Sequence, residues 1–441
     1  MRSQTFIALL LAVVLTSFTA IPTSLAAHSN GQQPAPAATT IPMLPGTSVP
    51  IKVGGGNQVN PSVACNIASY TDDDFEGSST IRYFDFATNT EHIVPGNGLD
   101  RLSDTDGQRI VFTELGATGD HNAIYDIATQ TTTFIGGPGN SDPAIGGNIV
   151  AFRTGDTPHQ NGEIQIYDRS TGGYNVVSLN DLKDFWPAVS PDGNVVVWAT
   201  CQAERLGCSI YSATKSSDGT LIFTRPVSTT GNNAYPDTNG QLIVYTSERN
   251  GENDIYWQRV GGSTEMRLAL PGDQRDARIS GNLIVFESQV ADLSYDVFVY
   301  DLKTARLYQV TNTPDVDESL SDIVTGCDGT NRIVYAKPGT FGDFDVWGFN
   351  FQLNDSVPDQ LNDLTALVLS FNLHDGTENS LISKLQDALA AVNSSNTATA
   401  CDSLTAFINA SQAQSGKKLT AAQVKQLVDS ATQVKADLGC H

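Results

Sequence analysis

The chain has 441 residues, of which 40% are hydrophobic, so it is long enough for two or three domains and apolar enough to build cores. Its 48 acidic and 25 basic side chains give a formal net charge of −23, and a field of that sign repels phosphate backbones and anionic lipid. The composition therefore excludes an intrinsically disordered chain and argues against nucleic acid as a partner.

Residues 1–27 have the layout of a secretory signal peptide, because Arg2 precedes an apolar run that ends on small residues at Ala26 and Ala27. Polar residues and a proline interrupt this run, so it falls short of the roughly 20 apolar residues that a membrane span needs. A Pro/Ala/Thr-rich linker follows at 28–46. We expect a secreted protein, extracellular or associated with the cell surface, without stable membrane insertion once the signal is removed.

One pattern recurs seven times between residues 47 and 354: a polar turn, a β-branched run and a final aromatic residue. The clearest copy is "VSPDGNVVVW" at 189–198, and successive final aromatics are 40 to 49 residues apart, close to the roughly 40–45 residues of one propeller blade. A second strand pattern such as "NDIYW" follows each copy, and usually a third. The sequence predicts a mainly β fold, a seven-bladed β-propeller of four-stranded antiparallel blades.

The two ends of this region are expected to pair with each other. The last copy has no outer strand after "DVWGFNFQL", whereas "SVPIKVGG" at 48–55 has a strand pattern but no blade of its own. Placing Ile51 and Val53 in the outer strand of the seventh blade closes the ring and leaves no open edge there. Loss of residues 47–56 should then destabilise the ring.

The six cysteines are an even number in a chain expected to be exported, which suggests disulfides, although six cysteines allow 15 pairings. The first and seventh repeats, which are neighbours in a closed ring, hold one cysteine each. Two more flank a short loop between adjacent strands, and the last two lie in the C-terminal segment. The sequence contains no CxxC spacing, which argues against a metal-binding or redox role for these cysteines. The expected pairs are Cys65–Cys327, Cys201–Cys208 and Cys401–Cys440.

The "VSPDGNVVVW" and "NDIYW" pieces resemble the TolB-like, PD-repeat β-propeller family. In that family a turn of the Ser-Pro-Asp-Gly type precedes a buried strand, and an Asp-Ile-Tyr strand follows it. The resemblance covers residues 47–354. It implies the propeller fold, and its motifs say little about function.

From Val357 onward the apolar residues fall at helical spacing, which predicts four short amphipathic helices in a small α-helical bundle at 355–441. Thr420 and Gln423 form a capping box at the start of the last helix. The segment closely resembles the FIMAH domain, a helical module at the C-termini of exported bacterial proteins. That resemblance implies attachment or display at the cell surface, with a plain structural cap as the alternative.

Propellers carry functional groups at the mouth of the central channel, on the loops that enter the innermost strands. Carboxylates and aromatic rings at such a mouth would suit a sugar, which offers hydroxyls and an apolar face. Turn-forming aspartates and solvent-facing aromatics would produce the same pattern. The candidate ligand-binding positions, one per blade, are Asn60, Leu102, Asp142, Trp186, Tyr235, Asp276 and Asp317.

Metal ligands cannot be assigned from the sequence. The acidic stretches 71–77 and 315–322 gather carboxylates, but neither has the Asp-x-Asp-x-Asp-Gly spacing of a calcium loop. Three histidines, His92, His121 and His159, lie in three different repeats, so a shared site is unsupported. We expect no cofactor, and a calcium ion stays an open alternative.

The leading prediction is a non-catalytic recognition or scaffold protein that binds extracellular protein or polysaccharide through the propeller loops and the channel mouth. A peptidase of the prolyl oligopeptidase type is excluded, because no Gly-x-Ser-x-Gly hydrolase domain fits in the helical segment. The alternative is a carbohydrate-active enzyme, either a glycosidase or a polysaccharide lyase, that uses channel-mouth carboxylates such as Asp142 and Asp276. No residue is assigned a catalytic role.

Overall fold

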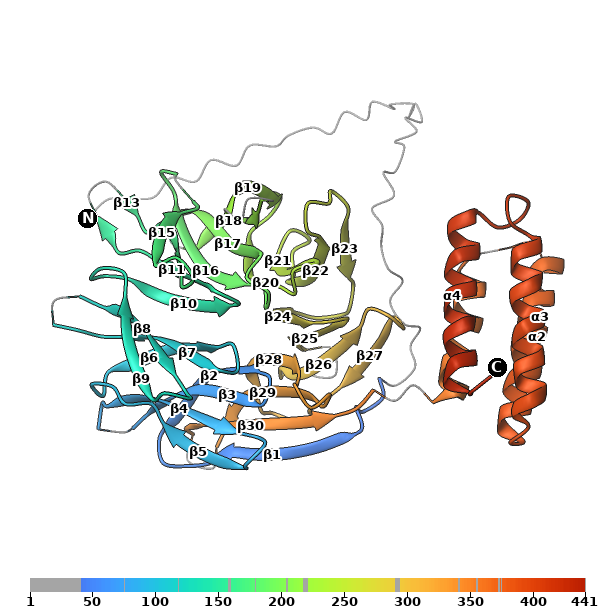
Figure 1. Cartoon of the computed structure of the whole chain (residues 1–441), viewed down its shortest axis with the longest axis horizontal. Coiled ribbons are helices and arrows are strands. Elements are labelled where there is room, and N and C mark those ends of the chain that lie inside the picture. Colours follow the sequence, from blue (N-terminus) through green and yellow to red (C-terminus); the bar gives the residue numbers. More distant parts are fainter. Residues whose placement is uncertain are drawn as a thin grey trace, which may run out of the picture.

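The computed structural model describes residues 41–440 apart from 75, 118, 158–159, 179, 204, 217–220, 290–293, 340–341, 354–355, 372 and 374. The expected signal peptide and most of the expected linker lie outside the described residues. The described strands form seven four-stranded antiparallel sheets arranged around a centre (Figure 1). A separate two-stranded ribbon, β12 (Asp156–Thr157) with β13 (Gln160–Asn161), lies between the second and third strands of the third sheet in chain order. The predicted seven-bladed propeller is confirmed.

Each blade has an innermost and a second strand joined by a tight turn. The innermost strands are β2 (Asn57–Ala64), β6 (Asp100–Thr105), β10 (Ser141–Gly146), β16 (Lys183–Val189), β20 (Asn233–Thr238), β24 (Gln274–Ser280) and β28 (Ser319–Thr325). The second strands are β3 (Ile67–Asp73), β7 (Arg109–Glu114), β11 (Ile149–Arg153), β17 (Val195–Ala203), β21 (Leu242–Ser247), β25 (Leu283–Ser288) and β29 (Asn331–Pro338).

The third and outermost strands complete each blade toward the rim of the ring. The third strands are β4 (Ser79–Asp85), β8 (His121–Asp126), β14 (Ile164–Asp168), β18 (Leu206–Lys215), β22 (Asp254–Arg259), β26 (Asp296–Asp301) and β30 (Phe344–Phe351). The outermost strands are β5 (Thr90–Ile93), β9 (Thr131–Ile135), β15 (Gly173–Val176), β19 (Leu221–Ser228), β23 (Glu265–Leu268), β27 (Arg306–Gln309) and β1 (Gly46–Lys52).

The aromatic residue that recurs in the sequence lies at the centre of each blade's second strand. Trp198 and its counterparts Phe112, Phe152 and Phe286 are fully buried. The β-branched residues around them are buried on both faces of the strand, because each blade packs against two neighbours. Trp198, for example, packs in one cluster with Ile149 of the preceding blade. The repeat therefore encodes the contacts between blades.

The ring closes as expected, with one correction. β1 pairs antiparallel with β30 as the outermost strand of the seventh blade, and Ile51 is buried in that position. The expectation for Val53 is wrong: β1 ends at Lys52, and the Val53 side chain is 55% exposed. The cause is the glycine run at 54–56, in which all three residues have positive φ and turn the chain toward β2.

Three disulfides form within the described residues, in the pairs expected from the sequence. Cys65–Cys327 joins the first and seventh blades, and Cys201–Cys208 joins directly opposed residues of β17 and β18. Disulfides are typical of proteins outside the reducing cytosol. Among the described helices, none combines the length and apolar character that crossing a bilayer requires.

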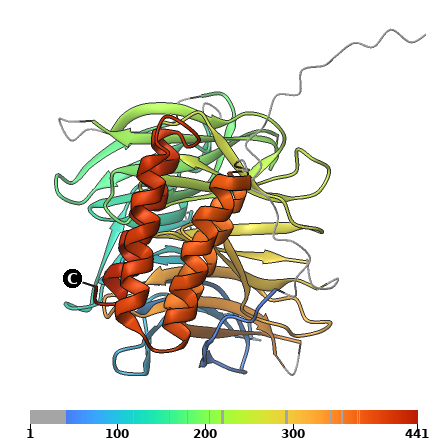
Figure 2. The ribbon, with the colours of Figure 1, turned by 90° about the vertical axis from the view of Figure 1, so that its right-hand side faces the viewer.

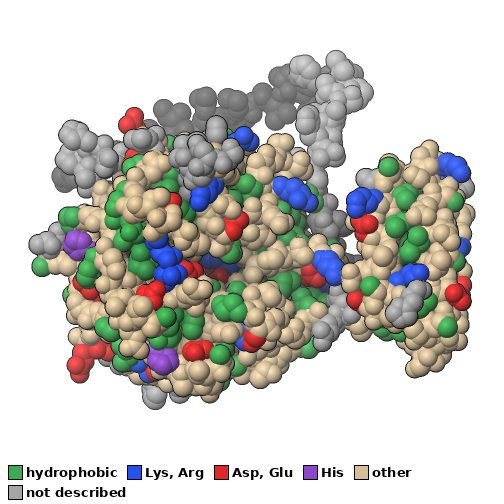
Figure 3. All heavy atoms as spheres, in the orientation of Figure 1, with side chains coloured by type: hydrophobic (Ala, Val, Ile, Leu, Met, Phe, Trp, Pro, Cys, Tyr) green, Lys and Arg blue, Asp and Glu red, His purple; other side chains and the backbone are tan. Residues whose placement is uncertain are grey.

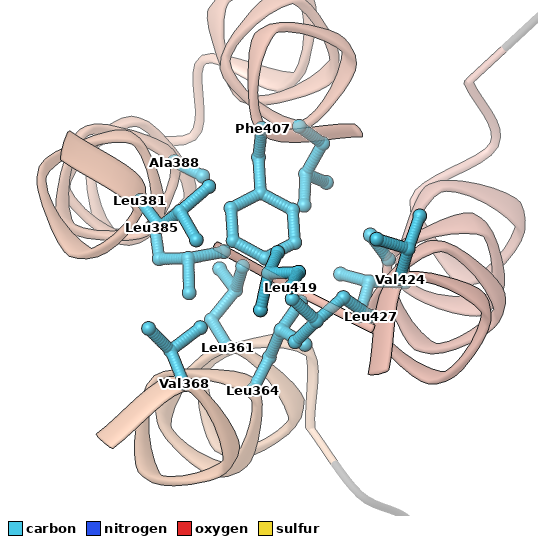
Figure 4. Close-up of a cluster of buried hydrophobic side chains, with 13 residues drawn as sticks. Leu361, Leu364, Val368, Leu381, Leu385, Ala388, Phe407, Leu419, Val424 and Leu427 are labelled. Carbon is cyan, nitrogen blue, oxygen red and sulfur yellow. The ribbon is translucent and has the colours of Figure 1, made fainter. Parts of the chain in front are cut away.

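Four helices follow the ring: α1 (Val357–Ser370), α2 (Asp375–Asn393), α3 (Thr397–Ala413) and α4 (Ala421–Asp437). The expected capping box at Thr420 and Gln423 is present. Phe407 points into the centre of the bundle, where leucines such as Leu364 and Leu381 surround it (Figure 4). Cys401–Cys440 ties α3 to the end of the chain.

The helices stand beside the ring rather than over its centre, on the side of β27, and run roughly parallel to one another (Figures 1 and 2). Arg306 on β27 contacts α1 through Asp363 (2.8 Å) and Asp359 (3.7 Å). The N-terminal end of the described chain lies on the same strand, because Leu44 N donates to Gln309 O (2.8 Å). Both ends of the ring sequence therefore meet the sixth blade.

Candidate functional site: the channel mouth

Every innermost strand carries a bulge at the same place, where its pairing with the second strand shifts register. In six blades the residue at the bulge has a φ between 51° and 57°, a left-handed conformation that is rare for residues other than glycine. A bulge re-aims side chains. The six residues are Asn60, Leu102, Asp142, Trp186, Tyr235 and Asp276.

Four of these six residues line one cavity in the centre of the ring. The cavity measures about 520 Å³ and extends from Asn60, Asp142, Trp186 and Tyr235 along the innermost strands to the Cys65–Cys327 disulfide. On the face seen in Figure 3, acidic and basic side chains gather near the centre of the ring among hydrophobic ones. The sequence-predicted positions thus converge, although they come from four different blades.

An aromatic pair forms one side of the mouth. The ring centroids of Trp186 and Tyr235 lie 4.4 Å apart at 40°, and Phe185 packs behind Trp186 at 5.6 Å. The Arg205 guanidinium lies 5.7 Å from the Trp186 ring centroid, within range of a cation–π interaction. Arg205 is exposed and occupies the tip of the β17–β18 hairpin, which Cys201–Cys208 cross-links close to that tip.

Carboxylates lie on other sides of the mouth. Burial raises the pKa of Asp142, and the nearby Arg153 and Arg205 oppose that rise. Burial also raises the pKa of Asp276, against the opposing charges of Arg278 and Arg275. Asp276 Oδ1 is buried and accepts no hydrogen bond from any described residue. Burial therefore makes ionisation of both carboxyl groups less favourable than in water, and the neighbouring arginines offset part of that effect.

A second layer of charged residues follows two positions after the bulges, and the sequence analysis missed it. Asp104, Asp237 and Asp322 each accept a hydrogen bond from a backbone N–H of the next blade. The bonds run from Ile145 N to Asp104 Oδ2 (2.8 Å), from Ile279 N to Asp237 Oδ2 (2.8 Å) and from Val63 N to Asp322 Oδ2 (2.7 Å). These aspartates link neighbouring innermost strands and form part of the cavity wall.

Arg278 stands at the equivalent position of the sixth blade and supplies the positive charge of this layer. Burial disfavours its charge, but Asp237, Asp276 and Asp322 outweigh burial and raise the pKa of Arg278. Burial, together with repulsion from Asp237, raises the pKa of Asp322 to about 7. A signal was present in the sequence, because aligning the repeats on their turns would have shown charged residues recurring at this position.

The remaining predicted positions are not part of the cavity lining. Leu102 and Asp276 occupy their bulges at the mouth but lie outside the lining itself. Asp317 precedes β28, is exposed and accepts a hydrogen bond from Tyr295 N (2.8 Å). The bulge of the seventh blade falls between Ser319 and Asp322, so the sequence alignment of that blade was displaced by a few residues.

The two histidines that the structure describes lie on strands of different blades. His92 is on the outermost strand β5, His121 begins β8, and His159 lies outside the described residues. Among the described residues, no group of three or more His, Cys, Asp or Glu side chains is placed to hold a metal ion.

No protein-family model matches the chain, and no curated protein matches it in sequence. Among solved structures, the β-propeller domain of the Trilobed protease from Pyrococcus furiosus is similar, with a TM-score of 0.53 and 13% identity over 69% of this chain and 100% of that one. A prolyl endopeptidase structure matches with a TM-score of 0.52 and 13% identity, over 67% of this chain and 47% of that one.

TolB from Acinetobacter baumannii also matches, with a TM-score of 0.39 and 16% identity over 65% of this chain and 79% of that one. The chain spans about half the length of the prolyl endopeptidase. At these identities, the likeness to the first two structures shows the propeller fold alone. The function therefore has to be argued from the site.

Proposed function

We propose that the protein is an exported, non-catalytic recognition or scaffold protein that binds an extracellular protein or polysaccharide at the channel mouth. The observation that carries the proposal is the convergence of Asn60, Asp142, Trp186 and Tyr235 on one cavity. Aromatic faces that lie beside hydrogen-bonding groups suit a ligand with both apolar and polar surfaces.

The backbone at these positions supports a binding role. Holding a tryptophan or a tyrosine in the left-handed region costs on the order of 1–3 kcal/mol, and both Trp186 and Tyr235 are held there by the bulged ladder. Side chains fixed by a rigid sheet lose little freedom when a ligand binds. The mouth is therefore a preorganised surface.

The arrangement of the helices fits a role in attachment or display, as the FIMAH resemblance implies. The bundle lies beside the ring, where Asp363 of α1 forms an ion pair with Arg306. In the view of Figure 1 the helices leave the centre of the ring uncovered. A ligand at the mouth and an attachment through the helices can then coexist. The disulfides support a location outside the cytosol.

Binding can be tested with the mature protein on a glycan array and in pull-downs from an extracellular protein fraction. Trp186→Asn and Tyr235→Asn remove the rings while keeping a residue that tolerates the left-handed backbone. We expect a loss of affinity of tenfold or more. The matched control is Phe134→Ala, which removes an exposed aromatic from β9 at the rim. Unchanged affinity in both mouth variants would overturn the proposal.

The enzyme alternative has a separate test. Mass spectrometry of plant, microbial and animal polysaccharides after incubation with the protein, with Ca²⁺ and Mn²⁺ supplied, is expected to show no new products. New oligosaccharides that disappear in Asp142→Asn would make the mouth catalytic. An unsaturated end on the products would then indicate a lyase, and a hydrated end a hydrolase.

A further inference from the structure

The layer of charged residues below the mouth carries more negative than positive charge. Asp104, Asp237 and Asp322 belong to the second, fifth and seventh blades, and all three line the cavity. Arg278 is the only basic residue among the described residues that line it. Three carboxylates against one guanidinium leave an excess of two negative charges when all of these groups are ionised.

The other two acidic residues of the cavity lining have positive charges beside them. Asp106 pairs with Arg109, whose Nη1 lies 3.4 Å from Asp106 Oδ2. Asp142, at the mouth, has Arg153 and Arg205 close enough to oppose the rise of its pKa. The uncompensated negative charge therefore belongs to the deeper layer and not to the rim of the mouth.

The three aspartates of the layer act on one another across the channel. Burial raises the pKa of Asp104, and the charge of Asp237 adds to that rise. Burial, followed by the charges of Asp237 and Asp104, raises the pKa of Asp322 in the same way. A positive charge placed among like-charged carboxylates stabilises the ionised form of each one. The channel is therefore an environment that favours a bound cation.

A hydroxyl group without a partner also lines the cavity. Ser321 is 3% exposed, and its Oγ makes no hydrogen bond to any described residue, although buried hydroxyls normally have a partner. On the third and fourth blades, Ala144 and Ala188 take the position that Asp104 occupies on the second. These small side chains leave room in the layer below Trp186, where a ligand can bring a hydrogen-bond donor.

The depth of the layer suits a long side chain that ends in a charge. The aspartates follow the bulge residues by two positions, which corresponds to roughly 6 Å along a strand. Lysine and arginine carry their charge at the end of an apolar stem of four or three carbons. Such a stem can lie against the Trp186 and Tyr235 rings while its charged group reaches the carboxylates. The ammonium of an amino sugar is attached directly to the ring, so the whole ring would have to enter the channel.

We propose that the channel mouth takes a lysine or arginine side chain of a protein partner, with its charged group bound among Asp104, Asp237 and Asp322. This proposal rests on the function proposed for the mouth and names the kind of partner. The stem packs on the aromatic pair, and the Ser321 hydroxyl accepts one N–H of the charged group. The formal net charge of −23 attracts a basic partner over a longer range.

The first test compares peptides on the mature full-length wild-type protein, so it needs no change to the ring. Titration calorimetry measures the binding of capped glycine pentapeptides that carry lysine, arginine or norleucine at the centre. Norleucine keeps the apolar stem and lacks the charge. We expect the two basic peptides to bind about tenfold or more tightly than the norleucine peptide. Equal affinities, or no binding of either basic peptide at millimolar concentrations, would overturn the proposal.

The second test removes one charge from the layer. Asp237→Asn keeps an oxygen that can accept the hydrogen bond from Ile279 N, and it should weaken binding of the basic peptides about tenfold or more. Glu248→Gln is the matched control, because it removes one negative charge from an exposed position outside the cavity lining. That variant should bind the peptides like the wild type. Thermal unfolding shows whether each variant is folded, and the wild-type comparison decides alone if Asp237→Asn is not.

The third test separates a protein partner from an amino polysaccharide. Chitosan oligosaccharides carry the same ammonium group on a sugar ring, and we expect them to bind more weakly than the lysine peptide. Chitosan binding that Asp237→Asn weakens, without binding of either basic peptide, would overturn the proposal.

The failure of this inference can be told apart from the failure of the proposed function. A partner whose affinity falls in Trp186→Asn and Tyr235→Asn but not in Asp237→Asn would overturn the inference and leave the proposed function intact. A partner whose affinity changes in none of these variants would overturn both.

Discussion

The ring and the helical bundle hold themselves together in different ways. The ring joins residues from opposite ends of its sequence: β1 pairs with β30, and Cys65 bonds Cys327 across 262 residues. The bundle is local, because its helices follow one another and its disulfide spans 39 residues. A domain that is closed by contacts between distant residues loses much of its stability when one closing element is removed. A domain built from local contacts loses only the stability that the removed element contributed. If the two parts unfold separately, calorimetry can follow each.

The largest expected effect comes from deleting residues 41–52. Without β1, the edge of β30 is open and the buried Phe351 and Ile51 contacts of the closing blade are lost. We expect the cooperative transition of the ring to disappear while that of the bundle stays. Differential scanning calorimetry of the truncated protein measures both. A ring that still unfolds at the wild-type temperature would contradict the closing role of β1.

Removing one disulfide from the ring and one from the bundle compares the two parts directly. The chain-entropy account assigns about 5.6 kcal/mol to closing a loop as long as Cys65–Cys327, and about 4 kcal/mol to one as long as Cys401–Cys440. Cys65→Ser with Cys327→Ser should lower only the ring transition. Cys401→Ser with Cys440→Ser should lower only the bundle transition. Denaturant unfolding of the two double variants tests this, and a shift of the wrong transition would show that the two parts are coupled.

Buried carboxylates that face each other between blades contribute to the pH dependence of the ring's stability. Glu163 of the third blade and Asp184 of the fourth share the hydroxyl of Ser178, at 3.0 and 2.6 Å. Burial first, and repulsion from Asp184 next, raise the pKa of Glu163 to about 7. In the folded ring Glu163 therefore keeps its proton up to about pH 7, whereas in the unfolded chain it releases that proton above about pH 4.5.

The stability from this pair is fully present below about pH 4.5 and is lost as the pH rises through 7. The change amounts to up to about 3 kcal/mol, since one pKa unit corresponds to about 1.4 kcal/mol. Glu163→Gln should reduce the dependence of the ring's unfolding temperature on pH between 4.5 and 8, and Asp322, whose pKa is also raised to about 7, should keep part of it. Thr133→Gln, a change of an exposed residue on the rim strand β9, serves as the control. Parallel pH curves for Glu163→Gln and wild type would refute the assignment.

The smallest effect is expected in the bundle. Thr420→Ala removes the side chain that accepts a hydrogen bond from Gln423 N and caps α4. The cost should be about 1 kcal/mol, which lowers the unfolding temperature of a domain of this size by about 4–8 °C. Gln426→Ala, at an exposed position within α4, is the control. The ring transition should not move in either variant.

Much of the fold could be predicted from the sequence because the strand pattern of one blade recurs seven times. Seven aromatic anchors at near-constant spacing predicted the blade count, and the neighbour relation of the first and last blades then suggested the Cys65–Cys327 pair. Val53 was misplaced because a strand pattern does not show where the glycines that follow it turn the chain.

The site was harder to read. A tryptophan or tyrosine in the left-handed conformation has no signature in the sequence, so the bulges that aim Trp186 and Tyr235 at the cavity were not foreseen.

The register of β1 on β30 has a mechanical consequence. Gly46 lies opposite Phe351, so the chain enters β1 and leaves β30 at the same end of the ladder. Tension applied between the N-terminal linker and the helices would open these hydrogen bonds one after another, like a zipper, instead of loading them together in shear. If the helices serve as the anchor, the ring keeps its shape under load only when the pull arrives through the channel mouth and not through the N-terminal tail.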